Sequence, residues 1–113
     1  MTFYHDILDE SGGEARAREA ELVGRSLALM RGATQSEAAP AAALEAARFA
    51  ERLWSHLIED LGSPRNALDP DLRADLISIG LFVMRETRAA ADGTGRLDAA
   101  IEVTEQLHAG LSA

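Results

Sequence analysis

Ala and Leu together account for 37 of the 113 residues, whereas only 13 residues carry a β-branched side chain. Ala, Leu, Arg and Glu have high helix propensity, while strands favour Val, Ile, Thr and aromatic residues. The chain contains only five aromatic residues, which are Phe3, Tyr4, Phe49, Trp54 and Phe82. The composition therefore predicts an all-α protein, and the length predicts one domain over residues 1–113.

Charge and cysteine content exclude several classes of protein. The net charge is −8, and all 11 cationic side chains other than His are Arg. This balance disfavours binding to nucleic acid or to an anionic membrane, because both need cations against phosphate. The absence of Cys excludes a disulfide framework and a thiolate metal site. Since no signal peptide and no apolar run of about 20 residues is present, we expect a cytoplasmic protein without membrane insertion.

Gly and Pro divide the chain into four predicted helices. Loop signals occur at 32–36, 62–66 and 92–95, where Gly or Pro ends a helix. The expected elements are a loose N-terminus over 1–12 and helices over 13–31, 36–61, 69–91 and 97–111. Short connections make consecutive helices antiparallel neighbours, so we predict a small four-helix bundle.

The first and third helices differ from an ordinary amphipathic helix. The first has a narrow apolar stripe and a polar half from Glu14 to Glu21, which predicts a loosely packed N-terminal helix. The third begins with Asp69-Pro70-Asp71, a typical helix start. From Leu76 to Met84 it is apolar nearly all round, so we predict a central helix contacted from several sides. Gly80 within it indicates close approach of a neighbouring helix, because Gly costs about 1 kcal/mol relative to Ala.

The polar residues do not predict an active site. Four groupings occur, and they are His5-Asp6, the cluster of His56, Glu59 and Asp60, the pair of Glu105 and His108, and Gly93-Thr94-Gly95. The first three lack a nucleophile or a third ligand, and a di-iron bundle needs two Glu-x-x-His motifs rather than one. The glycine sequence follows a predicted helix and is better interpreted as a helix stop. We therefore expect no enzymatic activity, no catalytic residues, no metal and no cofactor.

A set of short motifs runs from Arg52 into the third helix. They are Arg52-x-Trp54-Ser55-x-Leu57, Asp60, Pro64-x-Asn66-x-Leu68, Leu72-Arg73-Ala74 and Ile77 to Val83. In this order and at this spacing they resemble the FlaF family of flagellar biosynthesis regulators from alphaproteobacteria. The resemblance implies a cytoplasmic accessory protein that is needed for flagellin production or secretion. It also implies flagellin as a partner, together with a second regulator, FlbT.

A flagellin-binding export chaperone is the function that the resemblance and the chemistry favour. The terminal segments of flagellin are amphipathic helices that pair only in the filament, and a helical protein can cover such a segment in an apolar groove. We expect this groove between the second and third helices, or where the first helix packs loosely. The candidate partner-binding residues are Leu22, Met30, Arg52, Trp54, Leu57, Arg73, Leu81, Phe82 and Arg85.

Other interpretations of the same residues stay open. Trp54 and its apolar neighbours also fit an ordinary core. The protein is alternatively a post-transcriptional regulator of flagellin expression that acts through a protein partner, or a structural homodimer that pairs through its apolar helix. Direct RNA binding is disfavoured, because the chain has no Lys and few aromatic residues for stacking.

Overall fold

The computed structural model describes residues 13–35 and 39–113, and these ranges form four helices without strands. The helices are α2 (Gly13–Gln35), α3 (Ala39–Leu61), α4 (Pro70–Ala91) and α5 (Asp98–Leu111). Residues 1–12 and 36–38, including the expected start of the second helix at residue 36 and the His5-Asp6 pair, lie outside the described residues. The prediction of an all-α fold is confirmed.

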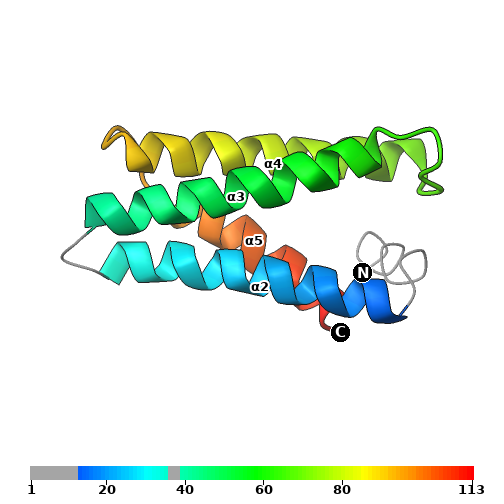
Figure 1. The fold of residues 1–113 in the computed structure, drawn as a ribbon, viewed down its shortest axis with the longest axis horizontal. Helices are drawn as coiled ribbons and strands as arrows, with labels where there is room; N and C mark the ends of the chain where they lie inside the picture. Colours follow the sequence, from blue (N-terminus) through cyan, green and yellow to red (C-terminus); the bar gives the residue numbers. More distant parts are fainter. Residues whose placement is uncertain (1–12, 36–38) are drawn as a thin grey trace.

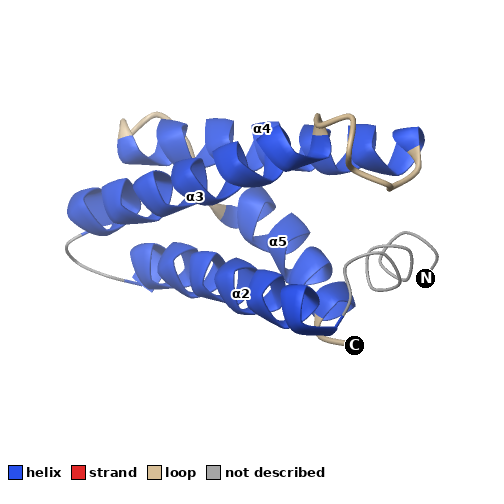
Figure 2. Ribbon diagram, turned by 45° about the vertical axis from the view of Figure 1, so that its right-hand side comes forward, coloured by secondary structure: helices blue, strands red, loops and turns tan. Residues whose placement is uncertain are grey.

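The helices form a small bundle in which α3 lies between α2 and α4 (Figure 1). Each helix runs opposite to the one before it, and α5 crosses the layer of the other three obliquely (Figure 2). α2 and α4 each pack against α3 and also against α5. The four helices therefore surround a shared interior, as predicted for a four-helix bundle.

The predicted start of α4 is confirmed in atomic detail. The Asp69 carboxylate accepts a hydrogen bond from the Asp71 backbone N–H at 3.0 Å, and Pro70 occupies the first helical position. In the preceding turn, the Asn66 side chain accepts from the Leu68 N–H at 3.0 Å and donates to Asp60 at 3.2 Å. These side-chain bonds fix the turn that brings α4 back along α3.

The predicted end of the first helix is wrong by one turn. α2 continues through Gly32 to Gln35, because Met30 and Ala33 are buried on its inner side. Burial of these side chains outweighs the cost of about 1 kcal/mol for a Gly within a helix. The stop after α4 is as expected, and Gly93 has a φ of 77°, which favours Gly there.

Two clusters of buried side chains make up the core. The larger consists of Val23, Ala50, Leu53, Trp54, Leu61, Leu72, Leu76, Val83, Leu107 and Leu111, and it draws on all four helices. The smaller consists of Met30, Ala33, Ala43, Ala46, Leu97 and Ala100 at the end of the bundle where α2 meets α3. The alanines of the smaller cluster allow the helices to approach closely at that end.

The packing of α2 differs between its two halves. Ala17, Arg18, Glu21 and Leu22 are exposed, which agrees with the prediction of loose packing. From Val23 onward the helix is anchored, since its side chains at Val23, Ser26, Leu27, Met30 and Ala33 are all buried. This spacing is that of a helix face turned toward the core. The prediction of a loosely packed helix therefore holds for the first half only.

Candidate partner-binding surfaces

The outward side of α4 exposes one large apolar side chain. The helix buries Leu72, Leu76, Gly80, Val83 and Thr87 on its inner side. On the opposite side Leu81 is 53% exposed, and no residue from Leu76 to Met84 carries a charge. The prediction that this helix is central is therefore wrong, because α3 and not α4 lies in the middle (Figure 1), although α4 is contacted from two sides, by α3 and by α5. Within Leu76 to Met84 only Ser78 and Leu81 are exposed.

Small and half-buried side chains surround Leu81. Ala74, Ser78 and Arg85 are exposed, and their spacing places them on the same helix face as Leu81. Half-buried Ile77 and Phe82 flank this face and pack against the core. The Arg85 guanidinium lies over the Phe82 ring, with 5.4 Å from Cζ to the ring centroid. We call these six residues the α4 surface: Ala74, Ile77, Ser78, Leu81, Phe82 and Arg85.

The groove expected between the second and third helices is closed at Trp54. The Trp54 side chain is only 2% exposed and packs directly against Gly80. A Cβ atom at Gly80 would lie 2.9 Å from Trp54 Cδ2 and 3.1 Å from Ile58 Cδ1. The close helix approach that Gly80 predicted is confirmed. As a contact residue Trp54 is a wrong prediction, because its ring fills the space between α3 and α4.

Three further residues that we predicted to contact a partner are buried or half-buried within the bundle. Met30 is completely buried in the smaller cluster, so its assignment to a contact surface is also wrong. Leu57 is half-buried against the larger cluster. Arg73 is half-buried, and its Nη1 donates to the Leu61 carbonyl at 3.4 Å. Arg73 thus donates to a carbonyl at the end of α3, while its buried Nε has no hydrogen-bond partner among the described residues.

The remaining two predicted residues, Leu22 and Arg52, lie on the other flank of α3. Leu22 of α2 is 41% exposed, and Arg52 of α3 is exposed. Arg52 and Arg25 both place their guanidinium groups over the Phe49 ring. Sequence reasoning missed Arg25 and Phe49, whose pairing is visible only once α2 and α3 are side by side.

The polar groupings that fall within residues 13–35 and 39–113 do not come together as a metal site. Glu105 pairs with Arg31, while the His108 ring packs against Gly24 of α2. His56 and Glu59 are exposed, and Asp60 accepts its bond from Asn66. Across residues 13–35 and 39–113, no group of three or more His, Cys, Asp or Glu side chains is placed to hold a metal ion.

One carboxyl group has a shifted pKa. Burial raises the pKa of the Glu19 carboxyl, and the nearby Asp60 carboxylate raises it further, whereas Arg18 lowers it. Glu19 lies on α2 and Asp60 near the end of α3, so the two acids repel each other across the helix pair. The shift therefore reflects the packing of α2 against α3 in the bundle.

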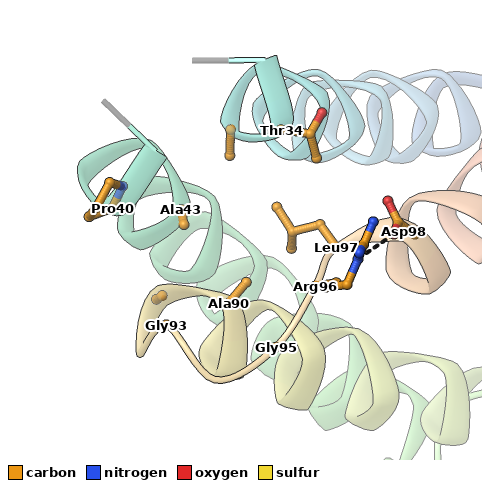
Figure 3. A pocket seen from close by; sticks show the side chains of 11 residues that line it. Thr34, Pro40, Ala43, Ala90, Gly93, Gly95, Arg96, Leu97 and Asp98 are labelled. Carbon is orange, nitrogen blue, oxygen red and sulfur yellow. Dashed lines mark hydrogen bonds and ion pairs between the residues drawn. The ribbon is translucent and has the colours of Figure 1, made fainter. Parts of the chain in front are cut away.

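A hollow of about 440 Å³ lies at the end of the bundle where α2, α3 and α4 meet the connection to α5 (Figure 3). Small residues line most of it, with Thr34 and the pair Arg96 and Asp98 as the polar side chains. The Arg96 Nε donates to Asp98 at 2.9 Å, and the Thr34 hydroxyl donates to the Arg31 carbonyl at 2.7 Å. Its polar side chains are thus already engaged with other groups of the protein.

The family comparison covers nearly the whole chain. A family model described as flagellar protein FlaF matches residues 1–111 of the 113. The chain belongs to the FlaF family. Its description is that of a flagellar protein and names no reaction. No curated protein and no solved structure shows significant similarity to this FlaF-family chain. Within the part that the structure describes, its helices lack the combined length and apolar character needed to span a bilayer.

Proposed function

We propose that this FlaF-family protein is a non-enzymatic export chaperone that binds flagellin in the cytoplasm and promotes its synthesis or secretion. The observation that carries the proposal is the 53% exposure of Leu81 on the outward side of α4, within a run from Leu76 to Met84 that has no charge. An ordinary surface helix places charged residues on its outer side. The α4 surface carries one charge, at Arg85, beside exposed Leu81, and apolar surface bordered by polar residues is found at protein interaction sites.

The α4 surface offers small and apolar side chains against which an amphipathic helix could pack. Exposed Ala74 and Ser78 let a second helix approach closely, and Leu81 offers one large apolar side chain beside them. Half-buried Ile77 and Phe82 border the contact on its two sides. A partner helix that packs its apolar residues around Leu81 would cover this face. The terminal helices of unassembled flagellin are partners of this kind.

Regulation of flagellin expression by this protein is compatible with the same proposal. The net charge of −8 disfavours direct contact of this chain with mRNA. An effect on translation would then pass through a protein partner such as FlbT. In this arrangement the occupancy of the α4 surface by flagellin would report how much subunit awaits export.

Binding of purified flagellin monomer tests the proposal. We expect a complex by isothermal titration calorimetry, and we expect Leu81→Glu to weaken it by about tenfold or more, because a charge would be buried in an apolar contact. Leu44→Glu is the matched control, since Leu44 is 40% exposed but lies on a different helix, near the start of α3. Flagellin without its terminal segments should bind neither the unaltered protein nor the Leu44→Glu variant.

Two results would contradict the proposal. The first is the absence of a complex with intact flagellin, or equal affinities for the Leu81→Glu and Leu44→Glu variants. The second is a homodimer, detected by light scattering, that Leu81→Glu dissociates and that binds no flagellin. That result would assign the α4 surface to pairing between copies of this chain.

A further inference from the structure

A second exposed patch lies on the flank of α3 that faces α2. The Phe49 ring is half-buried there, and the Arg25 and Arg52 Cζ atoms lie 5.5 Å and 5.9 Å from its centroid. Leu22 lies one turn before Arg25 on α2 and is 41% exposed. We call these four residues, Leu22, Arg25, Phe49 and Arg52, the α2–α3 surface.

The helix directions make these residues one continuous surface. α2 and α3 run antiparallel (Figure 1), and Arg25 meets Phe49 between them. One turn back along α2 leads to Leu22, and one turn forward along α3 leads in the same direction to Arg52. Leu22 therefore lies on the same side of the Arg25 and Phe49 contact as Arg52 does.

The guanidinium groups of Arg25 and Arg52 can still bind a carboxylate while they lie over the Phe49 ring. An Arg that lies over an aromatic ring retains the N–H donors in its own plane for a bidentate carboxylate. Glu21 and Glu45 lie one turn from Arg25 and Phe49 on their own helices. In the described part of the chain, however, the ion pairs within 4 Å join neither of them to Arg25 or Arg52.

We infer that the α2–α3 surface binds the acidic face of an amphipathic helix from a protein partner. Its carboxylates pair with Arg25 and Arg52, and an apolar side chain between them covers Leu22 and Phe49. Charge complementarity selects this partner, because two arginines and an apolar centre stand out on a molecule of net charge −8. The inference goes beyond the α4 surface: Glu51, two residues after Phe49, pairs with Arg88 of α4 on the opposite flank of α3.

A nucleic acid fits the same patch less well. Phosphates also pair with guanidinium groups, but an RNA strand extends well beyond two arginines and then meets the negative charge of the rest of the molecule. A short acidic helix needs only the local cations and the apolar centre. Its binding should weaken with salt, since the contacts lie at the surface.

Fluorescence anisotropy with three labelled probes tests the inference on the full-length protein. The probes are an amphipathic helical peptide of about 18 residues built from Leu, Ala and Glu, the same peptide with Lys for Glu, and a single-stranded RNA of about 20 nucleotides. We expect only the acidic peptide to bind. Arg52→Glu should weaken its binding by about tenfold, and Arg25→Glu should do the same.

Arg65→Glu is the matched control, because Arg65 is exposed in the turn before α4 and its substitution changes the net charge equally. We expect this variant to bind the acidic peptide as the unaltered protein does. Failure of the acidic peptide to bind would overturn the inference, as would equal weakening by Arg52→Glu and Arg65→Glu. Binding of the RNA that Arg52→Glu abolishes would overturn it in favour of a nucleic acid. The flagellin experiment uses Leu81 on α4, so the two proposals fail independently.

Discussion

Single buried hydroxyl groups differ in how well the bundle accommodates them. Thr87 is completely buried, and its hydroxyl donates to the Val83 carbonyl at 2.8 Å within α4. Thr104 of α5 and Ser26 of α2 are each 1% exposed, and their hydroxyl oxygens have no hydrogen-bond partner among the described residues. A buried hydroxyl without a partner costs free energy, whereas a bonded one contributes about 1 kcal/mol.

This contrast predicts opposite effects of the same substitution. Thr104→Val should increase the free energy of unfolding by about 1 kcal/mol, because a methyl group replaces an unpaired hydroxyl of similar volume. Thr87→Val should leave stability unchanged or lower it by about 1 kcal/mol, since it removes a hydrogen bond. Urea denaturation followed by circular dichroism measures both values. Destabilisation by Thr104→Val would show that the native hydroxyl does have a partner.

The raised pKa of Glu19 predicts a pH-dependent stability. Between the ordinary value of 4.5 and its raised value in the fold, the folded protein holds a proton that the unfolded chain has released. The contribution of Glu19 to stability therefore falls as the pH rises through this window. Glu19→Gln should then be more stable than the unaltered protein at neutral pH, and its advantage should disappear as the pH falls toward 4.5.

Thermal melts across this pH range measure the effect. Glu21→Gln is the control, because Glu21 is exposed on the same helix and its substitution makes the same change in charge. An advantage of Glu19→Gln that persists unchanged at low pH would show that the gain does not come from removing the carboxylate.

At the scale of whole helices, the contact of α3 with α4 depends on the missing side chain of Gly80. Gly80→Ala should destabilise the protein by about 1–3 kcal/mol, because its Cβ would overlap the Trp54 ring and force α3 and α4 apart. Gly32→Ala is the matched control: a Cβ there meets nothing within 4 Å, and the substitution should stabilise α2 by about 0.5–1 kcal/mol. Chemical denaturation of the two variants shows whether each substitution raises or lowers the free energy of unfolding. Stabilisation by Gly80→Ala would contradict the close packing described.

The helix boundaries were predictable where local chemistry decides them. Asp69 and Pro70 specify the start of α4 through a side-chain cap and a fixed backbone angle, both encoded within three residues. The end of α2 was not predictable in this way. Gly32 is a helix-ending signal by itself, and only the burial of Ala33 against the start of α3 carries the helix past it. Local signals therefore fail where contacts distant in sequence outweigh them.

For the molecule as a whole, the sequence predicted the bundle but not which apolar side chains remain uncovered. Apolar composition measures the tendency to leave water, whether the cover comes from the same chain or from a partner. Trp54 and Leu81 are both large apolar residues and cannot be distinguished by hydrophobicity. In the fold, however, Trp54 is 2% exposed and Leu81 is 53% exposed. The pairing of Phe49 with Arg25 was equally hidden, since it joins residues of different helices.

The position of α3 between its two neighbours has a consequence for assembly (Figure 2). Phe49 contacts Arg25 of α2 on one flank, and Glu51 pairs with Arg88 of α4 on the other. The α4 surface and the α2–α3 surface share no residue, so occupation of one would leave the side chains of the other available. If both proposals hold, the protein could bridge two different molecules in one assembly.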